Sequence, residues 1–134
     1  MYSMKEMCEK TGLSYETLKF YCNQGLIPDV RRDAQNRRVF EEHHVGWVHG
    51  LLCLRRCGMG LSEMKDYLDL LAKGKESIPQ LKEILARKRE ELERSKAEIE
   101  ESLRFIEWKQ QFYDDVTAGK LPDWTETMTD TEHP

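Results

Sequence analysis

An apolar residue recurs at every seventh position over residues 78–117, and this repeat constrains the fold more than any other feature. The repeating positions are Ile78, Leu85, Leu92, Ile99, Ile106 and Tyr113. A sustained seven-residue apolar period with charged flanks is typical of a coiled coil. Roughly 38 helical residues at about 1.5 Å each span ~57 Å, more than a domain of this size can bury. We therefore expect the helix to pair with a second copy of the chain; the alternative is a solvent-exposed helix on its own domain.

The first 25 residues predict two short helices joined by a tight turn. Ser3, with Glu6 three residues later, fits the capping box of a helix that runs to about Lys10. Ser14 can cap a second helix over residues 15–24. Two short helices around a glycine-containing turn are the helix-turn-helix pattern.

An arginine-rich hairpin is expected to follow the second helix. A turn around residues 33–36 separates two extended segments, the second over residues 37–40. Four arginines lie in eight residues, with only Asp33 to oppose them: Arg31, Arg32, Arg37 and Arg38. The whole chain has a formal net charge of −4, so a local basic cluster indicates a directed anionic partner. A solvated loop is the alternative.

Two more helices are expected before the coiled coil. One covers residues 42–57, with His43 and His44 facing solvent, and the next is capped by Ser62 and ends near Gly74. The predicted domains are a winged helix-turn-helix domain with linker helices (1–75), a coiled-coil dimerisation helix (76–118) and a flexible acidic tail (119–134). The fold class is therefore mainly α.

Several function classes are excluded at this stage. The sequence contains no run of some 18 apolar residues, so we expect no membrane span. The N-terminus lacks the apolar region of a secretory signal. We therefore expect a cytoplasmic protein with reduced thiols at its four cysteines, Cys8, Cys22, Cys53 and Cys57. The chain shows no paired carboxylates, nucleophile triad or phosphate loop, so we expect neither an enzyme nor a bound cofactor.

Taken in order and spacing, several stretches resemble the MerR family of transcription regulators. They are residues 2–6, 11–21, 25–28, 31–33, 38–40 and 54–61. The resemblance implies a winged helix-turn-helix and an antiparallel two-helix coil in a homodimer. It also implies a mechanism in which the dimer sits on a promoter with dyad symmetry. When an effector binds, the dimer distorts the DNA so that RNA polymerase can use the promoter.

The resemblance also implies the residues that contact DNA. The second helix would enter the major groove, and the hairpin would act as a wing on phosphates or the minor groove. The expected contacts are Ser14, Tyr15, Thr17, Lys19, Phe20 and Tyr21 on the helix, with Arg31, Arg37 and Arg38 on the wing. Two alternatives stay open: Tyr21 belongs to the core, or Thr17 only faces solvent.

The segment around Cys53 resembles the aldehyde-responsive branch of the family, whose reactive cysteine precedes a Leu-basic pair shortly before Gly-Met. Cys53 and Cys57 are therefore candidate sensors, because a thiolate adds to an electrophilic carbon. Cys53 could instead be a buried small hydrophobe. A metal-responsive reading uses His49 with both cysteines, although this stripe spans ~12 Å on one helix. A coiled-coil protein-interaction module without an effector is the remaining alternative.

Overall fold

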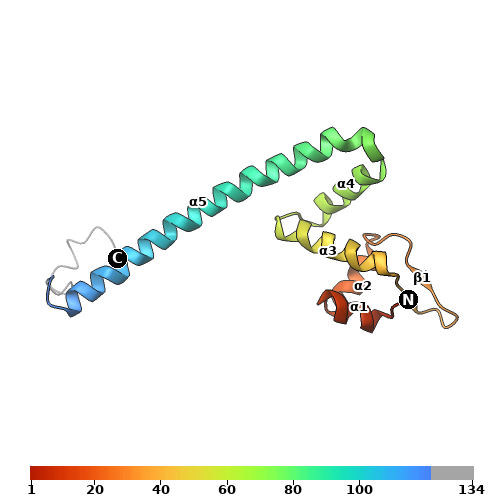
Figure 1. The fold of residues 1–134 in the computed structure, drawn as a ribbon, viewed down its shortest axis with the longest axis horizontal. Coiled ribbons are helices and arrows are strands. Elements are labelled where there is room, and N and C mark those ends of the chain that lie inside the picture. Colours follow the sequence, from red (N-terminus) through yellow and green to blue (C-terminus); the bar gives the residue numbers. More distant parts are fainter. Residues whose placement is uncertain (122–134) are drawn as a thin grey trace. The chain divides into compact units, whose positions relative to one another are not determined.

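The computed structural model describes residues 1–121 of the chain (Figure 1). The chain divides into two units. Met1–Lys88 form one compact unit, and a second begins at Arg89. Their elements, in order, are α1 (Met4–Thr11), α2 (Tyr15–Asn23), β1 (Arg31–Arg32), β2 (Arg38–Val39), α3 (Glu42–Arg56), α4 (Leu61–Ala72), the 3₁₀ turn η1 (Gly74–Ser77) and α5 (Ile78–Thr117). The predicted mainly helical winged domain with a long C-terminal helix is confirmed. The domain limits at residues 75 and 118 stay predictions, and most of the predicted tail lies outside the described residues.

Side-chain caps set where α1 and α2 begin. The Glu6 amide donates to Ser3 Oγ at 3.1 Å, and the Ser3 amide donates to Glu6 Oε1 at 3.1 Å, which completes the predicted capping box. Ser14 Oγ accepts from the Thr17 amide at 3.2 Å, a cap that typically stabilises a helix by about 1 kcal/mol. Gly12 ends α1 at φ 77°, a left-handed conformation that glycine adopts without strain. These caps hold α2 close to α1 with a short, defined turn.

The core of Met1–Lys88 lies among α1, α2, α3 and the start of α4. Its buried apolar residues are Met7, Leu18, Tyr21, Leu26, Ile27, Phe40, Val48, Leu51, Met59 and Met64. The indole Nε1 of Trp47 donates to the Leu26 carbonyl at 2.7 Å, which ties α3 to the segment after α2. Tyr2 pairs with Phe40 in an isolated antiparallel bridge, so the base of the hairpin is held against the N-terminus. The position of the wing relative to α2 is therefore fixed from both of its ends.

Two sequence predictions are wrong, one about the cap of α4 and one about the exposure of His44. Ser62 does not cap α4. The N-cap is Gly60, whose backbone is extended, so the helix begins at Leu61, two residues before the start that a Ser62 cap implies. His44 does not face solvent: it is 1% exposed, and its Nδ1 accepts from the Glu41 amide at 2.9 Å. Its Nε2 lies 2.8 Å from the Pro28 carbonyl, so a neutral ring with the proton on Nε2 satisfies both partners. His44 thus takes the place of the Glu or Gln side chain that usually closes a capping box, with Nδ1 as the acceptor for the Glu41 amide.

The first turns of α5 pack on α4. Ser77 is buried and donates to the carbonyls of Leu70 and Gly74. Lys88 Nζ lies 2.7 Å from Glu63 Oε2 on α4, and this bond is the main reason the pKa of Glu63 is lowered. Ile84 packs against the core. These contacts fix where α5 starts within the first unit.

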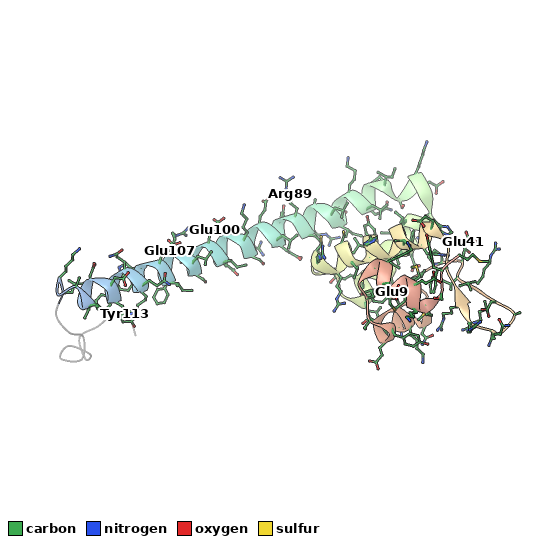
Figure 2. All side chains as sticks on the ribbon, turned by 60° about the horizontal axis from the view of Figure 1, so that its bottom comes forward. Glu9, Glu41, Arg89, Glu100, Glu107 and Tyr113 are labelled. Carbon is green, nitrogen blue, oxygen red and sulfur yellow. The ribbon has the colours of Figure 1, made fainter. Side chains whose placement is uncertain are left out.

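None of the forty residues of α5, all of which the structure describes, is buried in the single chain. The six residues of the seven-residue repeat are between 43% and 60% exposed. Figure 2 shows Arg89, Glu100 and Glu107 along one side of α5 and Tyr113 on another. The helix therefore carries a continuous apolar seam, Ile78 to Tyr113, that its own chain leaves exposed. Residues 1–121 contain no helix with the length and apolar character needed to cross a bilayer.

Candidate nucleic-acid interface

Helix α2 presents a polar and aromatic face to solvent at its N-terminal end. Tyr15 is 55% exposed and Phe20 is 45% exposed, and Lys19 is also exposed. Thr17 is half-buried. Ser14 Oγ also donates to Thr17 Oγ1 at 2.9 Å. Both hydroxyls therefore already make hydrogen bonds within the N-terminal cap of α2. Tyr15 and Lys19 are one helical turn apart and therefore project from one face of α2. Phe20 lies on another face, where it lines a depression with Tyr21 and Arg55.

Tyr21 combines a buried ring with an available hydroxyl. The residue is only 4% exposed and belongs to the core, as one of the alternatives predicted. Its hydroxyl has no hydrogen-bond partner among the described residues. Every buried side-chain oxygen and nitrogen in this part of the chain does have a partner, so the Tyr21 hydroxyl is not fully buried. Tyr21 also lines, with Arg55, a shallow depression between α2 and the α3–α4 turn. The core role and a contact through the hydroxyl are compatible.

The wing is a two-stranded antiparallel hairpin closed by Asp33. Arg31 pairs with Val39 and Arg32 with Arg38. Asp33 Oδ1 accepts from the amides of Gln35 at 3.0 Å and Arg37 at 2.9 Å. The Arg37 guanidinium lies 3.3 Å from Asp33 Oδ2. The Arg37 amide, then that of Gln35 and the Arg37 charge, lower the pKa of Asp33, which keeps this turn closed at neutral pH.

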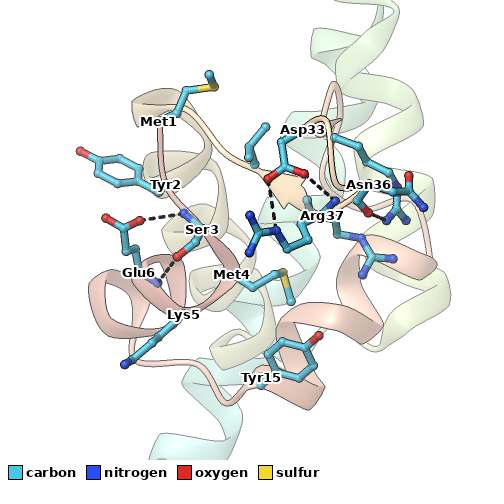
Figure 3. Close-up of a pocket in the computed structure, with 13 residues that line it drawn as sticks. Met1, Tyr2, Ser3, Met4, Lys5, Glu6, Tyr15, Asp33, Asn36 and Arg37 are labelled. Carbon is cyan, nitrogen blue, oxygen red and sulfur yellow. Dashed lines mark hydrogen bonds and ion pairs between the residues drawn. The ribbon is translucent and has the colours of Figure 1, made fainter.

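A groove of about 610 Å³ lies between the wing, the start of α1 and Tyr15 (Figure 3). Its positively charged lining residues are Lys5, Arg32, Arg37 and Arg38. The opposing carboxylates in the lining are Glu6, held by its capping box, and Asp33, held by the turn. Most of the predicted wing cations therefore converge with the exposed end of α2 on one concave surface.

Arg31 is separated from that group. It lines a different depression, with Asp29, Glu41 and His43, because successive residues of a strand point to opposite faces. Arg32 takes its place in the groove, where its Nη1 donates to the Asn36 carbonyl at 2.8 Å. Arg32 and Lys5 were missed as site residues. The two-residue period of the hairpin could have identified Arg32, whereas Lys5 is brought in only by the tertiary packing of α1.

Replacing Asp33 by alanine should open the wing turn, because the two amide bonds and the Arg37 pair are lost together. The folded pKa of Asp33 is lowered, so its stabilisation is present above the unfolded value of 3.8 and is lost as pH falls through the folded pKa. We expect the Gln35 and Arg37 amide resonances of the wild type to stay in place at neutral pH and to move in NMR spectra as the pH falls through the lowered folded pKa of Asp33. In Asp33→Ala both amides lose their acceptor, so their resonances should be displaced from the wild-type positions at pH 7 and should not titrate in acid. Unchanged amide positions in the variant would contradict this role.

Cys53 lies on the exposed face of α3, away from the core residues Val48 and Leu51. The alternative in which Cys53 is a buried hydrophobe is therefore wrong for the single chain. Cys57 is half-buried at the C-cap, where its amide donates to the Cys53 carbonyl at 3.1 Å. By contrast, burial raises the pKa of the Cys8 and Cys22 thiols. Of the four cysteines, Cys53 is the one a solute in bulk water reaches most readily.

The stripe of His49, Cys53 and Cys57 does not form a metal site in the single chain. Across residues 1–121, no three His, Cys, Asp or Glu side chains come close enough together to hold an ion. Successive members of the stripe are one helical turn apart, so the outer two are too distant to share a metal. The metal-responsive reading thus lacks a ligand set in this part of the chain.

Family models match two overlapping stretches of the chain. Residues 2–71 match the model of MerR HTH family regulatory proteins, and residues 47–108 match the model described as MerR, DNA binding. An HTH-type transcriptional regulator of Haemophilus influenzae is 30% identical over 132 residues, which cover 94% of this chain and 98% of the relative. The HTH-type transcriptional regulator AdhR of Bacillus subtilis is 29% identical over 83 residues, covering 62% of this chain and 59% of the relative.

Solved structures of regulators resemble the fold over most of its length. The structure of HiNmlR, described as a MerR family regulator lacking the sensor domain and bound to promoter DNA, has a TM-score of 0.77 and 30% identity. It covers 87% of this chain and 89% of its own. A MerR family transcriptional regulator from Listeria monocytogenes has a TM-score of 0.78 and 28% identity, with 97% and 96% of the two chains covered.

Proposed function

The chain belongs to the MerR family of helix-turn-helix transcriptional regulators, and on that premise we propose that it binds a promoter of dyad symmetry as a homodimer. The groove that joins Tyr15 to Arg32, Arg37 and Arg38 carries this proposal. In this proposal the guanidinium groups of the groove bind DNA phosphates. The exposed N-terminal end of α2, which lies beside them, enters the major groove. HiNmlR, whose structure holds promoter DNA, supports the same assignment.

The homodimer is proposed from α5. A forty-residue helix with a continuous exposed apolar seam needs a partner, and a second copy supplies an identical seam. Two copies would present two winged modules, as duplex readers require when half-sites lie about 34 Å apart on one face. Distortion of the DNA between the half-sites would then bring the promoter into use by RNA polymerase.

The proposed effector is a small electrophile such as an aldehyde, and Cys53 is its proposed target. Exposure of Cys53 on α3 and similarity to AdhR support this choice. The thiolate attacks the carbonyl carbon, a C–S bond forms, and the carbonyl oxygen takes up a proton, so the adduct is a hemithioacetal with no leaving group. Cys57, one turn further along α3, is the second candidate thiol.

Replacing Arg38 by alanine should weaken binding to every duplex by about three- to tenfold, because a phosphate contact does not depend on sequence. Each dimer loses two contacts, so the slope of log affinity against log salt should become shallower by about two. Fluorescence anisotropy between 50 and 300 mM salt measures both on a duplex selected by the wild-type protein from a randomised pool.

The matched control is Arg87→Ala, which removes one positive charge from the exposed surface of α5. Its affinity and salt slope should equal those of the wild type. A salt-independent wild type would contradict DNA binding through phosphates and favour a module that docks on protein. An unchanged slope in Arg38→Ala would remove Arg38 from the interface.

A further inference from the structure

The last residue of α2 is bonded to the wing. Asn23 Oδ1 accepts a hydrogen bond from Arg38 Nη2 at 2.6 Å, across 15 residues of sequence. Asn23 is exposed at the end of α2, and Arg38 lies half-buried on β2. This bond joins the helix assigned to the major groove with the strand assigned to the phosphates.

The surroundings of Asn23 place two wing cations at the same end of α2. The positive charges of Arg38 and Arg32 act on the thiol of Cys22, the preceding residue, and lower its pKa, although burial has the larger effect and raises it. Arg32 is also the cross-strand partner of Arg38. The Asn23–Arg38 bond is therefore part of a close approach between α2 and the hairpin.

The chemistry of the acceptor matters. Asn23 contributes a neutral amide oxygen, so it fixes the direction of the Arg38 guanidinium without cancelling its charge. A guanidinium has five N–H donors, and the bond to Asn23 uses one of them. The other four remain able to donate hydrogen bonds to a phosphate. Arg37 differs, because its partner is the carboxylate of Asp33 at 3.3 Å. Of these two arginines, Arg38 is the one held in place with its full charge available.

We propose that Asn23 is a positioning residue that holds the Arg38 guanidinium ready for a DNA phosphate and so sets the spacing between α2 and the wing. The inference rests on the proposed DNA binding. Preorganisation of this kind raises affinity because less side-chain freedom is lost when the complex forms.

A double-mutant cycle tests this assignment with the chain of residues 1–134 and the selected duplex described above. Asn23→Ala should weaken binding by about three- to fivefold when Arg38 is present and by less than about 1.5-fold in the Arg38→Ala background. The adjacent Gln24→Ala is the control, since Gln24 Oε1 accepts from Lys65 Nζ on α4 at 2.8 Å and not from the wing. Its effect, whatever its size, should be the same in both backgrounds.

Asn23→Asp separates positioning from a merely structural role. The aspartate keeps an acceptor for Arg38, so thermal unfolding should match that of the wild type. Its charge should nevertheless neutralise Arg38 and repel phosphate, so DNA affinity should fall at least as far as in Asn23→Ala and the salt slope should become shallower.

Equal effects of Asn23→Ala in both backgrounds, or wild-type affinity and slope in Asn23→Asp, would overturn the positioning role. If DNA binding by the wild-type protein did not depend on salt, the proposed function itself would be overturned. The two failures are therefore distinguishable within one set of titrations.

Discussion

Replacing Leu92 and Ile99 together by glutamate should convert the proposed dimer into a folded monomer and lower DNA affinity by about 100-fold or more. Both side chains lie in the middle of the α5 seam and are 43% and 60% exposed in the single chain. Their loss therefore removes nothing from the core of Met1–Lys88. In a paired coil, however, four buried carboxylates per dimer would face apolar partners at a large desolvation penalty.

Size-exclusion chromatography with light scattering gives the mass, and anisotropy on the selected duplex gives the affinity. The matched control is Arg94→Gln with Ala97→Glu, which changes the net charge by the same two units on the side of α5 away from the seam. The control should stay dimeric and bind like the wild type. A seam variant that remains dimeric, or a monomer with wild-type affinity, would show that α5 does not join the two DNA-binding units.

Replacing Cys53 by serine should abolish the transcriptional response to an aldehyde while leaving dimerisation and DNA affinity unchanged. Serine keeps the size and exposure of the side chain but lacks a thiolate, so the carbonyl carbon meets no comparable nucleophile at neutral pH. A reporter gene behind the selected site, with formaldehyde as the probe, measures the response. We expect expression in Cys53→Ser to stay at the uninduced level at every sublethal dose.

Cys57→Ser, made in parallel, removes the neighbouring thiol of α3 and should keep the response. Brief labelling with iodoacetamide followed by mass spectrometry should show slower alkylation of Cys53 in the aldehyde-treated protein than in the untreated protein, because the adduct blocks the thiol. A full response in Cys53→Ser would move the sensor to Cys57 or to a group that is not a thiol. Loss of the response in Cys57→Ser alone would assign the role to Cys57.

Local signals in the sequence predicted most of the fold. The capping box of Ser3 and the cap of Ser14 act within one helical turn, so their chemistry is readable from spacing alone. The seven-residue repeat similarly predicted the full extent of α5. Ser62 shows the limit of this reasoning, because α4 begins at Leu61, where the extended backbone of Gly60 ends, with no side-chain cap.

The parts of the candidate site that the sequence did not reveal depend on contacts between distant elements. His44 is buried because its two ring nitrogens meet groups from different segments. Arg31 and Arg32 are adjacent in sequence yet line different depressions, since the hairpin alternates its faces. The bond from Arg38 to Asn23 joins residues 15 apart in the sequence, so no local sequence pattern predicts it.

Hydroxyl-radical footprinting of the wild-type protein on its selected duplex tests the central claim most directly. Two copies joined through α5 should protect two segments of equal length, related by a dyad and centred about one helical turn, ~34 Å, or a multiple of it apart on one face. A single protected segment without a symmetric counterpart, at concentrations that saturate the duplex, would contradict binding as a dimer.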